Sequence, residues 1–331
     1  MEGDLAMKVM TMVQAINNAL DIKFQEDPTI VTYGEDVGVE GGVFRVTEGL
    51  QKKYGVNRVF DSPLAESAIV GSAVGMAANG LKPIVELQFC GFVYPSYNQM
   101  ISHVARFHNR SRGRYKMQMV IRFPYGGGIN ALEHHSESME TIYGHIPGIK
   151  VVIPSTPYDA KGLLISAIES EDPIIFMEPK RIYRAIKQEV PEEKYSIPLG
   201  KAKVLQQGTD LTLIAWGAMI REAQKAMVMA KKDGISIELI DLRSIYPIDR
   251  QTIIESVKKT GRVVIVHEEP LTFGTGAELT AIINEEAFLN LEAPVSRVAG
   301  FDTIVPLPKG EPHYIISPEK IYYHILKTMK F

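Results

Sequence analysis

The chain has 331 residues, which is long enough for two domains. Its hydrophobic content of 45% and charged content of 23% are typical of a globular protein. The net charge of −3 gives no electrostatic reason to expect nucleic acid or an anionic membrane as a partner. Cys90 is the single cysteine, which excludes a disulfide framework and a cysteine zinc site and fits a reducing compartment.

The start of the chain, MEGDLAMKVM, is acidic and lacks the apolar core of a signal peptide. The longest apolar runs are far shorter than the ~20 residues that span a bilayer. We therefore expect a cytoplasmic protein with no membrane segment. The one basic cluster, RFHNRSRGRYK at 106–116, is interpreted as a solvated loop or a partner contact.

Strand-like runs and helical patterns alternate along the chain, which predicts the α/β class with mainly parallel sheets. In the first half, strands are predicted at 29–36, 82–89, 117–124, 148–156 and 173–179. Helical patterns lie between them, after Ser62, at 94–109 and at 157–170. Cys90 is interpreted as a small core residue in the strand that begins near Lys82.

A polar stretch with two prolines, residues 186–200, is predicted to be a linker between a domain at 1–185 and a domain at 201–331. The second domain repeats the α/β pattern. Its strands are predicted at 210–217, 236–243, 262–269 and 294–300, and its helices at 219–234, 249–261 and 275–288.

The apolar helix of the first domain is headed by one carboxylate, Glu66. If Ser62 caps this helix and Pro63 is its first residue, the capping-box acid belongs at Ala65, so Glu66 should point elsewhere. The helix behind it, in ESAIVGSAVGMAANG, is apolar on nearly every face, which predicts burial and, at Gly71 and Gly75, close approach of another backbone. No cation lies nearby in sequence, which leaves open what Glu66 faces.

The common nucleotide, metalloprotease and serine hydrolase motifs are absent from the sequence. YGGGIN at 125–130 either lines a ligand or serves turn geometry. His134 and His135 are adjacent, so they point in different directions and do not form a metal-ligand pair. Glu35 and Glu66 are both predicted at the carboxyl ends of parallel strands, where ligands of open α/β sheets bind.

Several stretches together are familiar: DSPLAESAIVGSAVGMAANG, PIVELQFCGFVYPSYNQ, HHSES, PGIKVVIPSTPYDAKGLL and LEAPVSRVAGFDT. They resemble the beta subunit of the thiamine-diphosphate-dependent first component of 2-oxo acid dehydrogenase complexes, over roughly residues 8–331. The resemblance implies two parallel-sheet α/β domains. The first is a transketolase-like pyrimidine-binding domain, and the second is similar to the transketolase C-terminal domain.

The resemblance also implies a site. Glu66 matches the glutamate that bonds N1′ of the cofactor's aminopyrimidine and favours the imino tautomer that acts as a base. The carboxyl must keep its proton for this, which apolar surroundings without a cation favour. Leu64, Gln88 and Phe92 fall beside the cofactor, with Phe92 stacking on the pyrimidine where some branched-chain relatives carry tyrosine. Glu35 matches an acid of a proton relay between paired sites.

His135 matches the histidine near the incoming lipoyl group, where it would act as an acid–base group in acyl transfer. His134 then remains a surface residue. A structural potassium site of some relatives uses backbone carbonyls that correspond to those near Ala167, Ser170 and Asp172.

The chain contains no GDG motif for the divalent metal that neutralises a bound diphosphate. The resemblance therefore implies that an alpha subunit holds magnesium and half of the cofactor, in an α2β2 heterotetramer. The further partner is the lipoyl acyltransferase core, bound through its peripheral subunit-binding domain.

The expected reaction is oxidative decarboxylation of a 2-oxo acid and reductive acylation of the lipoyl group. Residues 267–308 look like branched-chain members of the family, which we favour, whereas residues 155–170 and YGGGIN look like bacterial pyruvate members. Acetoin dehydrogenase and a non-enzymatic α/β binding module are the alternatives.

Overall fold

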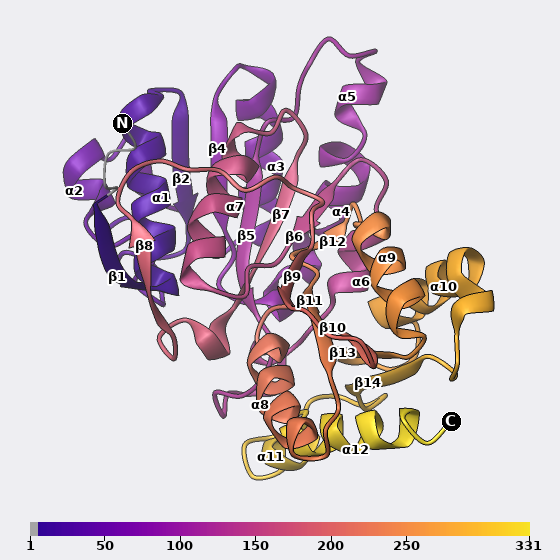
Figure 1. Cartoon of the computed structure of the whole chain (residues 1–331). Helices are drawn as coiled ribbons and strands as arrows, with labels where there is room; N and C mark the ends of the chain where they lie inside the picture. The colour runs from indigo at the N-terminus through magenta and orange to yellow at the C-terminus, as the bar shows by residue number, and fades with distance from the viewer. Residues whose placement is uncertain (1–5) are drawn as a thin grey trace. The chain divides into compact units, whose positions relative to one another are not determined.

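The computed structural model describes residues 6–331, so most of the acidic start of the chain lies outside the described residues. The chain forms two compact units. The first comprises the residues up to Tyr125 together with Ile142–Leu199, and the second comprises Gly126–Thr141 together with Gly200–Phe331. The predicted linker, 186–200, contains strand β8 (Lys187–Pro191), which pairs antiparallel with β1 (Met7–Thr11) at the opposite end of the first unit's sequence (Figure 1).

The first unit is built on parallel strands in the order β6-β7-β5-β4-β2-β3. These strands are β2 (Ile30–Gly34), β3 (Val59–Asp61), β4 (Lys82–Glu86), β5 (Val120–Tyr125), β6 (Lys150–Val152) and β7 (Ile174–Pro179). The α-helices are α1 (Met12–Glu26), α2 (Leu50–Tyr54), α3 (Glu66–Ala78), α4 (Tyr97–Gln99), α5 (Phe107–Arg110) and α7 (Pro157–Glu169). Strands β2, β5 and β7 are buried along their whole length, as in a parallel sheet covered on both faces.

The helix headed by Glu66 starts later than predicted. Ala65, not Ser62, occupies the N-cap position, and no side chain caps the helix. Ser62 donates its backbone N–H to the carbonyl of Gly34 at 2.9 Å, which continues the pairing of β2 with β3 beyond Asp61. The helix is also not buried all round in this chain, because Ala68, Ser72 and Gly75 are exposed.

The close backbone approach predicted at Gly71 and Gly75 is not made within residues 6–331. A Cβ at Gly71 would meet only the Gln99 side chain at 3.4 Å, and one at Gly75 would meet nothing within 4 Å. The small residues of α3 therefore leave an open surface on this chain.

The chain after β4 also differs from the prediction. Cys90 lies in a 3-10 turn (Cys90–Phe92) rather than in the strand, which ends at Glu86, although its core role is confirmed by 1% exposure. The predicted helix at 94–109 is broken into short pieces, with a π-helical turn at Met100–Val104 between α4 and α5. Met100 and Val104 are both buried, which fits the use of π-turns to adjust local packing.

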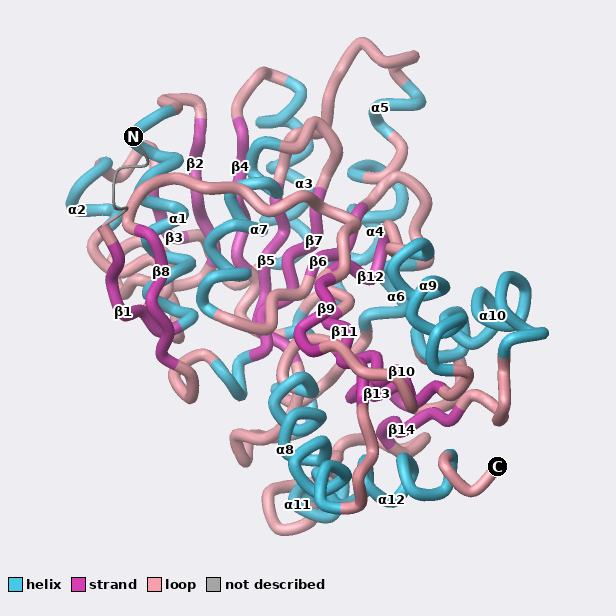
Figure 2. The backbone as a smooth tube through the Cα atoms, viewed as in Figure 1, coloured by secondary structure: helices cyan, strands magenta, loops and turns pink. Residues whose placement is uncertain are grey.

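The second unit contains a sheet in the order β14-β13-β10-β11-β9, parallel except for β9. The strands of the second unit are β9 (Lys203–Gln206), β10 (Leu211–Ala215), β11 (Ile237–Asp241), β12 (Ser244–Tyr246), β13 (Val263–Pro270) and β14 (Ser296–Gly300), of which all but β12 belong to this sheet. Its helices are α8 (Met219–Lys232), α9 (Arg250–Thr260), α10 (Thr275–Ala287), α11 (Glu311–Tyr314) and α12 (Pro318–Thr328), while α6 (Glu140–Gly144) crosses the sequence boundary of the units. Figure 2 shows α8 with α12 and α9 with α10 as two pairs that flank this sheet.

Sequence signals define several ends of these helices. Asp249 caps α9 by accepting the N–H of Thr252, and Gly261 ends it in the left-handed conformation. Thr156 caps α7 in the same way, ahead of Pro157 at its first position. Within residues 6–331, no helix has the length and apolar character required to cross a membrane.

Candidate active site

Three carboxylates follow neighbouring parallel strands of the first unit. Strand β2 ends at Gly34 and is followed by Glu35 and Asp36, while β3 beside it ends at Asp61 and leads to Glu66 at the start of α3. Both Glu35 and Glu66 thus follow the carboxyl ends of strands, which confirms that part of the prediction. Gly34 is required at this edge, because a Cβ there would lie 2.4 Å from the backbone oxygen of Glu86.

Glu35 and Glu66 form a buried acidic pair, at 8% and 9% exposure. Burial, and then the negative charges of Glu66 and Asp36, together raise the pKa of Glu35 to about 7. Among residues 6–331, no side chain or backbone N–H donates a hydrogen bond to the Glu66 carboxylate, and no cation pairs with it. A carboxylate accepts a hydrogen bond and a protonated carboxyl donates one, so a ligand of either kind could be the partner of Glu66.

The other predicted cofactor contacts surround these acids in sequence. Gln88 follows β4 and donates from Nε2 to Oδ2 of Asp36 at 3.0 Å, so it bonds the residue next to Glu35 in the chain. Phe92 is half-buried and packs edge-to-face on Phe89, with ring centroids 5.5 Å apart. Leu64 precedes α3 and is 79% exposed, so its apolar side chain is uncovered in this chain.

Behind the acids lies a buried charged network that sequence reasoning missed. Arg122 on β5 donates to both oxygens of Glu178 on β7 at 2.7 and 2.8 Å and also to Glu86 on β4. All three side chains are buried, and burial raises the pKa of Glu86 despite the opposing effect of Arg122. The negative charge of Asp36 also raises the pKa of Glu86, which links the network to the candidate site. The sequence signal is a charged residue in each of these largely apolar strands, within β5 and near the ends of β4 and β7.

His135 belongs to the second unit, because the segment 126–141 is assigned to it, whereas the acidic pair belongs to the first. His135 is half-buried in a 3-10 turn (Glu133–His135), and its neighbour His134 is exposed. The two candidate catalytic residues, Glu66 and His135, therefore lie in different units.

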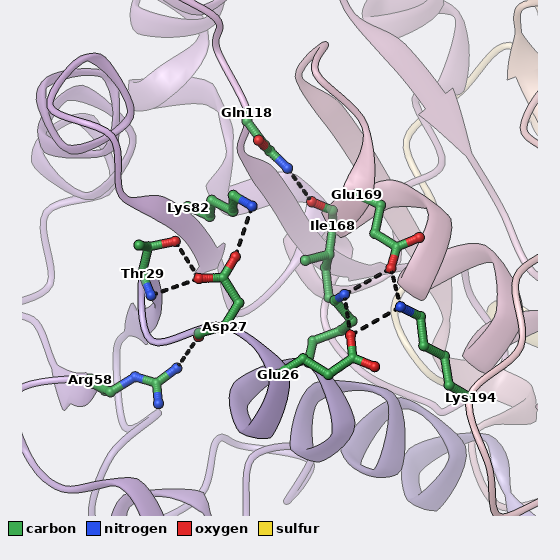
Figure 3. Close-up of polar contacts among 10 residues, drawn as sticks. Glu26, Asp27, Thr29, Arg58, Lys82, Gln118, Ile168, Glu169 and Lys194 are labelled. Atoms are coloured by element: carbon green, nitrogen blue, oxygen red, sulfur yellow. Dashed lines mark hydrogen bonds and ion pairs between the residues drawn. The ribbon is translucent and has the colours of Figure 1, made fainter.

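The predicted potassium segment lies at the C-terminal end of α7. The carbonyl of Ala167 accepts the N–H of Ser170 at 3.3 Å, and Asp172 pairs with Lys150 at 2.8 Å. Figure 3 shows the next carbonyl, that of Ile168, accepting from Gln118 at 2.9 Å.

Positive charge is already present at this end of α7. Lys23 and Lys194 each bridge Glu26 and Glu169, and Figure 3 shows Lys194 between these two acids. Within the described part of the chain, no three His, Cys, Asp or Glu side chains are arranged to hold a metal ion.

A separate cleft of about 820 Å³ lies in the first unit. It is lined by β1, the start of α1 and residues near Arg45 and Arg184, and none of the predicted site residues lines it. The candidate site is therefore defined by the strand ends and their charges rather than by this cleft.

The fold and its acidic strand edge define a transketolase-like α/β protein. Residues 8–186 match the family described as transketolase, pyrimidine binding domain, and residues 200–321 match transketolase, C-terminal domain. A solved structure described as split gene transketolase, inactive beta4 tetramer, superposes with a TM-score of 0.80 over 97% of this chain and 98% of that chain, at 22% identity. That likeness shows the fold.

Closer relatives show the family. The chain is 59% identical to the pyruvate dehydrogenase E1 component subunit beta of Acholeplasma laidlawii, over 98% of this chain and 99% of that protein. It is 50% identical to the protein of the same name from Bacillus subtilis (strain 168), over 98% and 100%. The chain belongs to the beta subunits of the first component of 2-oxo acid dehydrogenase complexes, as its sequence predicted. Membership implies thiamine diphosphate as the cofactor.

Proposed function

We propose that this chain is the beta subunit of a pyruvate dehydrogenase. With its alpha subunit it would decarboxylate pyruvate oxidatively and acylate the lipoyl group of an acyltransferase core. The observation that carries this proposal is the buried Glu35–Glu66 pair without a cation, at the ligand-binding edge of a pyrimidine-binding domain. Relatives with 50% and 59% identity carry the pyruvate name, so we choose pyruvate over the branched-chain acids that residues 267–308 favour.

The residues present fit the cofactor. When bound, thiamine diphosphate supplies the electron sink that decarboxylation of a 2-oxo acid requires. The Glu66 carboxyl would donate a hydrogen bond to N1′ of the aminopyrimidine, which would give this buried group its missing partner. Phe92, Leu64 and Gln88 would contact the cofactor through apolar surface and one amide.

Glu35 is suited to hold or release a proton at neutral pH, because its pKa is raised to about 7. We propose that it relays protons to and from the Glu66 region. His135 would act as the acid–base group in acyl transfer to the lipoyl group.

We further propose that the working form is an α2β2 heterotetramer in the cytoplasm, in which the alpha subunit holds magnesium. The exposed side of α3 supports a subunit contact, since it carries only the small residues Ala68, Ser72 and Gly75. The 79% exposure of Leu64 supports a site that is completed by another chain. The acyltransferase core would bind through its peripheral subunit-binding domain.

A structural potassium ion at the end of α7 is also proposed. A carbonyl oxygen with one hydrogen bond keeps a second lone pair, so the carbonyl of Ala167 remains able to bind a cation. Exchange of potassium for sodium should then lower the melting temperature of the heterotetramer. An equal melting temperature in the two salts would exclude this ion.

The test of the proposed function is co-expression with the alpha subunit, followed by assays with pyruvate, branched-chain 2-oxo acids and acetoin. We expect the highest kcat/KM with pyruvate and no activity from the beta chain alone. A preference for branched-chain acids or acetoin would replace pyruvate as the substrate. Failure of the chain to bind any alpha subunit would favour the non-enzymatic binding module.

A further inference from the structure

The glycine run at 126–128 surrounds a carboxylate of the chain itself. Both oxygens of Glu311, at the start of α11, accept backbone N–H groups, from Gly128 at 2.7 Å and from Asn130 at 2.8 Å. Glu311 is 1% exposed. Gly128 and Asn130 have φ values of +90° and +55°, and successive N–H groups in such turns form a nest that binds an anion. The anion of this nest is Glu311.

Carboxylates close to Gly126 and Gly127 explain why glycine is needed at these two positions. A Cβ at Gly127 would lie 3.1 Å from Oε1 of Glu311, and one at Gly126 would lie 2.6 Å from Oε2 of Glu268. The positive φ values and these contacts support the interpretation of the glycine run as a turn, whereas a ligand-lining loop stays a prediction.

The other end of the segment is held by a second buried acid. Glu269, near the end of β13, accepts the N–H of Thr141 at 2.5 Å and the N–H of Thr275 at 2.8 Å. Beside it, Trp216 donates from Nε1 to Glu140 at 3.2 Å. Burial and then the charge of Glu269 raise the pKa of Glu140 well above its usual range, and burial also raises the pKa of Glu269.

These contacts use the edge of the second unit's sheet at which ligands of parallel sheets bind. Trp216 directly follows β10, and Glu269 lies in the last residues of β13, which is its parallel neighbour. The carboxyl edge of this sheet is thus occupied by the chain's own residues 140 and 141. His135 lies between the two anchored ends.

We propose that Glu311 and Glu269 are positioning residues that anchor the segment 126–141 and thereby fix His135 for acyl transfer. The role of His135 rests on the proposed function, whereas the anchoring of the segment does not. Loss of either anchor should loosen the segment and slow the step that uses His135. Decarboxylation, which uses the acids of the first unit, should be affected much less.

The experiment compares Glu311→Gln and Glu269→Gln with the wild type in the reconstituted heterotetramer. Gln has one acceptor oxygen in place of two, so one N–H loses its partner. Glu238→Gln is the matched control, because Glu238 is also buried in the second unit, accepts the N–H of Gly208 and pairs with Lys259. Hydrogen–deuterium exchange reports on the amides of Gly128, Asn130 and Thr141. Two assays report on function: decarboxylation with an artificial electron acceptor, and acylation of a lipoyl domain.

In the wild type we expect the amides of Gly128, Asn130 and Thr141 to be protected from exchange. Each Gln variant should speed exchange at its own end of the segment by about 10- to 100-fold, as expected for loss of a bond to a charged acceptor. Acylation should fall by about tenfold or more while decarboxylation stays within about twofold, and Glu238→Gln should change neither.

Two kinds of result would overturn the proposal, and a third would separate it from the proposed function. Unprotected amides in the wild type would exclude the anchors without the need for any variant, even if the variants fail to fold. Faster exchange with unchanged acylation, or with equal loss in both assays, would exclude the positioning role. Fast exchange in the variants of a protein that decarboxylates no 2-oxo acid would refute the proposed function but leave the anchors in place.

Discussion

The carboxylate of Glu66 acts directly on that of Glu35. Both are about nine-tenths buried, and the negative charge of Glu66 adds to burial in raising the pKa of Glu35 to about 7. The raised pKa leaves the Glu35 carboxyl able to take up or release a proton near neutral pH.

Glu66→Gln should lower the pKa of Glu35 below about 7, because the neighbouring negative charge is removed. Infrared difference spectra between proteins with and without Glu35→Gln would isolate this carboxyl band during a pH titration. The raised pKa of Glu35 also makes the stability of the folded protein depend on pH. The folded pKa lies above the unfolded value of 4.5, so the contribution of Glu35 to stability is lost as pH rises towards 7. An unchanged Glu35 titration in Glu66→Gln would show that the two acids are not coupled.

Arg122→Met should destabilise the protein by roughly 3–5 kcal/mol, because it leaves the carboxylates of Glu86 and Glu178 buried without their cation. Lys116→Met is the matched control, since Lys116 pairs with Glu171 at the surface, where both side chains are more than half exposed. Its loss should cost about 1 kcal/mol or less. Denaturant unfolding of the two variants measures both values, and similar losses would mean that the buried network contributes no more than a surface pair.

Gly126→Ala should lower the melting temperature more than Gly234→Ala. Both positions have positive φ, +87° and +77°, so both variants carry backbone strain. Only at Gly126 would the added Cβ also meet a carboxylate, that of Glu268 at 2.6 Å, whereas Gly234 faces open space. Thermal melting of the two variants isolates this contact. Equal melting temperatures would show that Glu268 moves aside without cost.

His135→Ala should reduce acylation of a lipoyl domain by about 100-fold or more, while decarboxylation with an artificial electron acceptor survives. His134→Ala is the natural control, because His134 is the adjacent and exposed histidine. It should leave both assays close to wild type. Equal loss of both activities in His135→Ala would contradict the assigned role.

Sequence periodicity predicted β2 and α3, which carry the two acids of the site, because each is a local pattern. It did not predict β3, because three residues are too few to show a period. It misplaced the start of α3, since the hydrogen bond from Ser62 to Gly34 joins distant segments and leaves no trace in local spacing. The membership of 126–141 in the second unit was missed for the same reason. It depends on Glu269 and Glu311, which lie more than a hundred residues further along the chain.

The charged network was missed for a different reason. Arg122 and Glu178 sit in apolar strands, where a single charge is readily passed over. Only the pairing of β5 with β7, in which Arg122 lies opposite Phe176, brings Glu178 two residues further along within reach of Arg122. The acidic pair, by contrast, was predicted because Glu35 and Glu66 each follow a strand in sequence. The role of Glu66 towards a cofactor came from the resemblance alone.

The most direct test of the account is the rate of pyruvate decarboxylation by the heterotetramer, compared between the wild type and Glu66→Gln. An artificial electron acceptor keeps the assay independent of the lipoyl step, and size-exclusion chromatography confirms assembly. We expect Glu66→Gln to assemble normally and to lose about 100-fold or more of its activity, because the amide can donate a hydrogen bond but, unlike the carboxyl, cannot transfer its proton. A wild-type rate in the assembled Glu66→Gln protein would contradict the account.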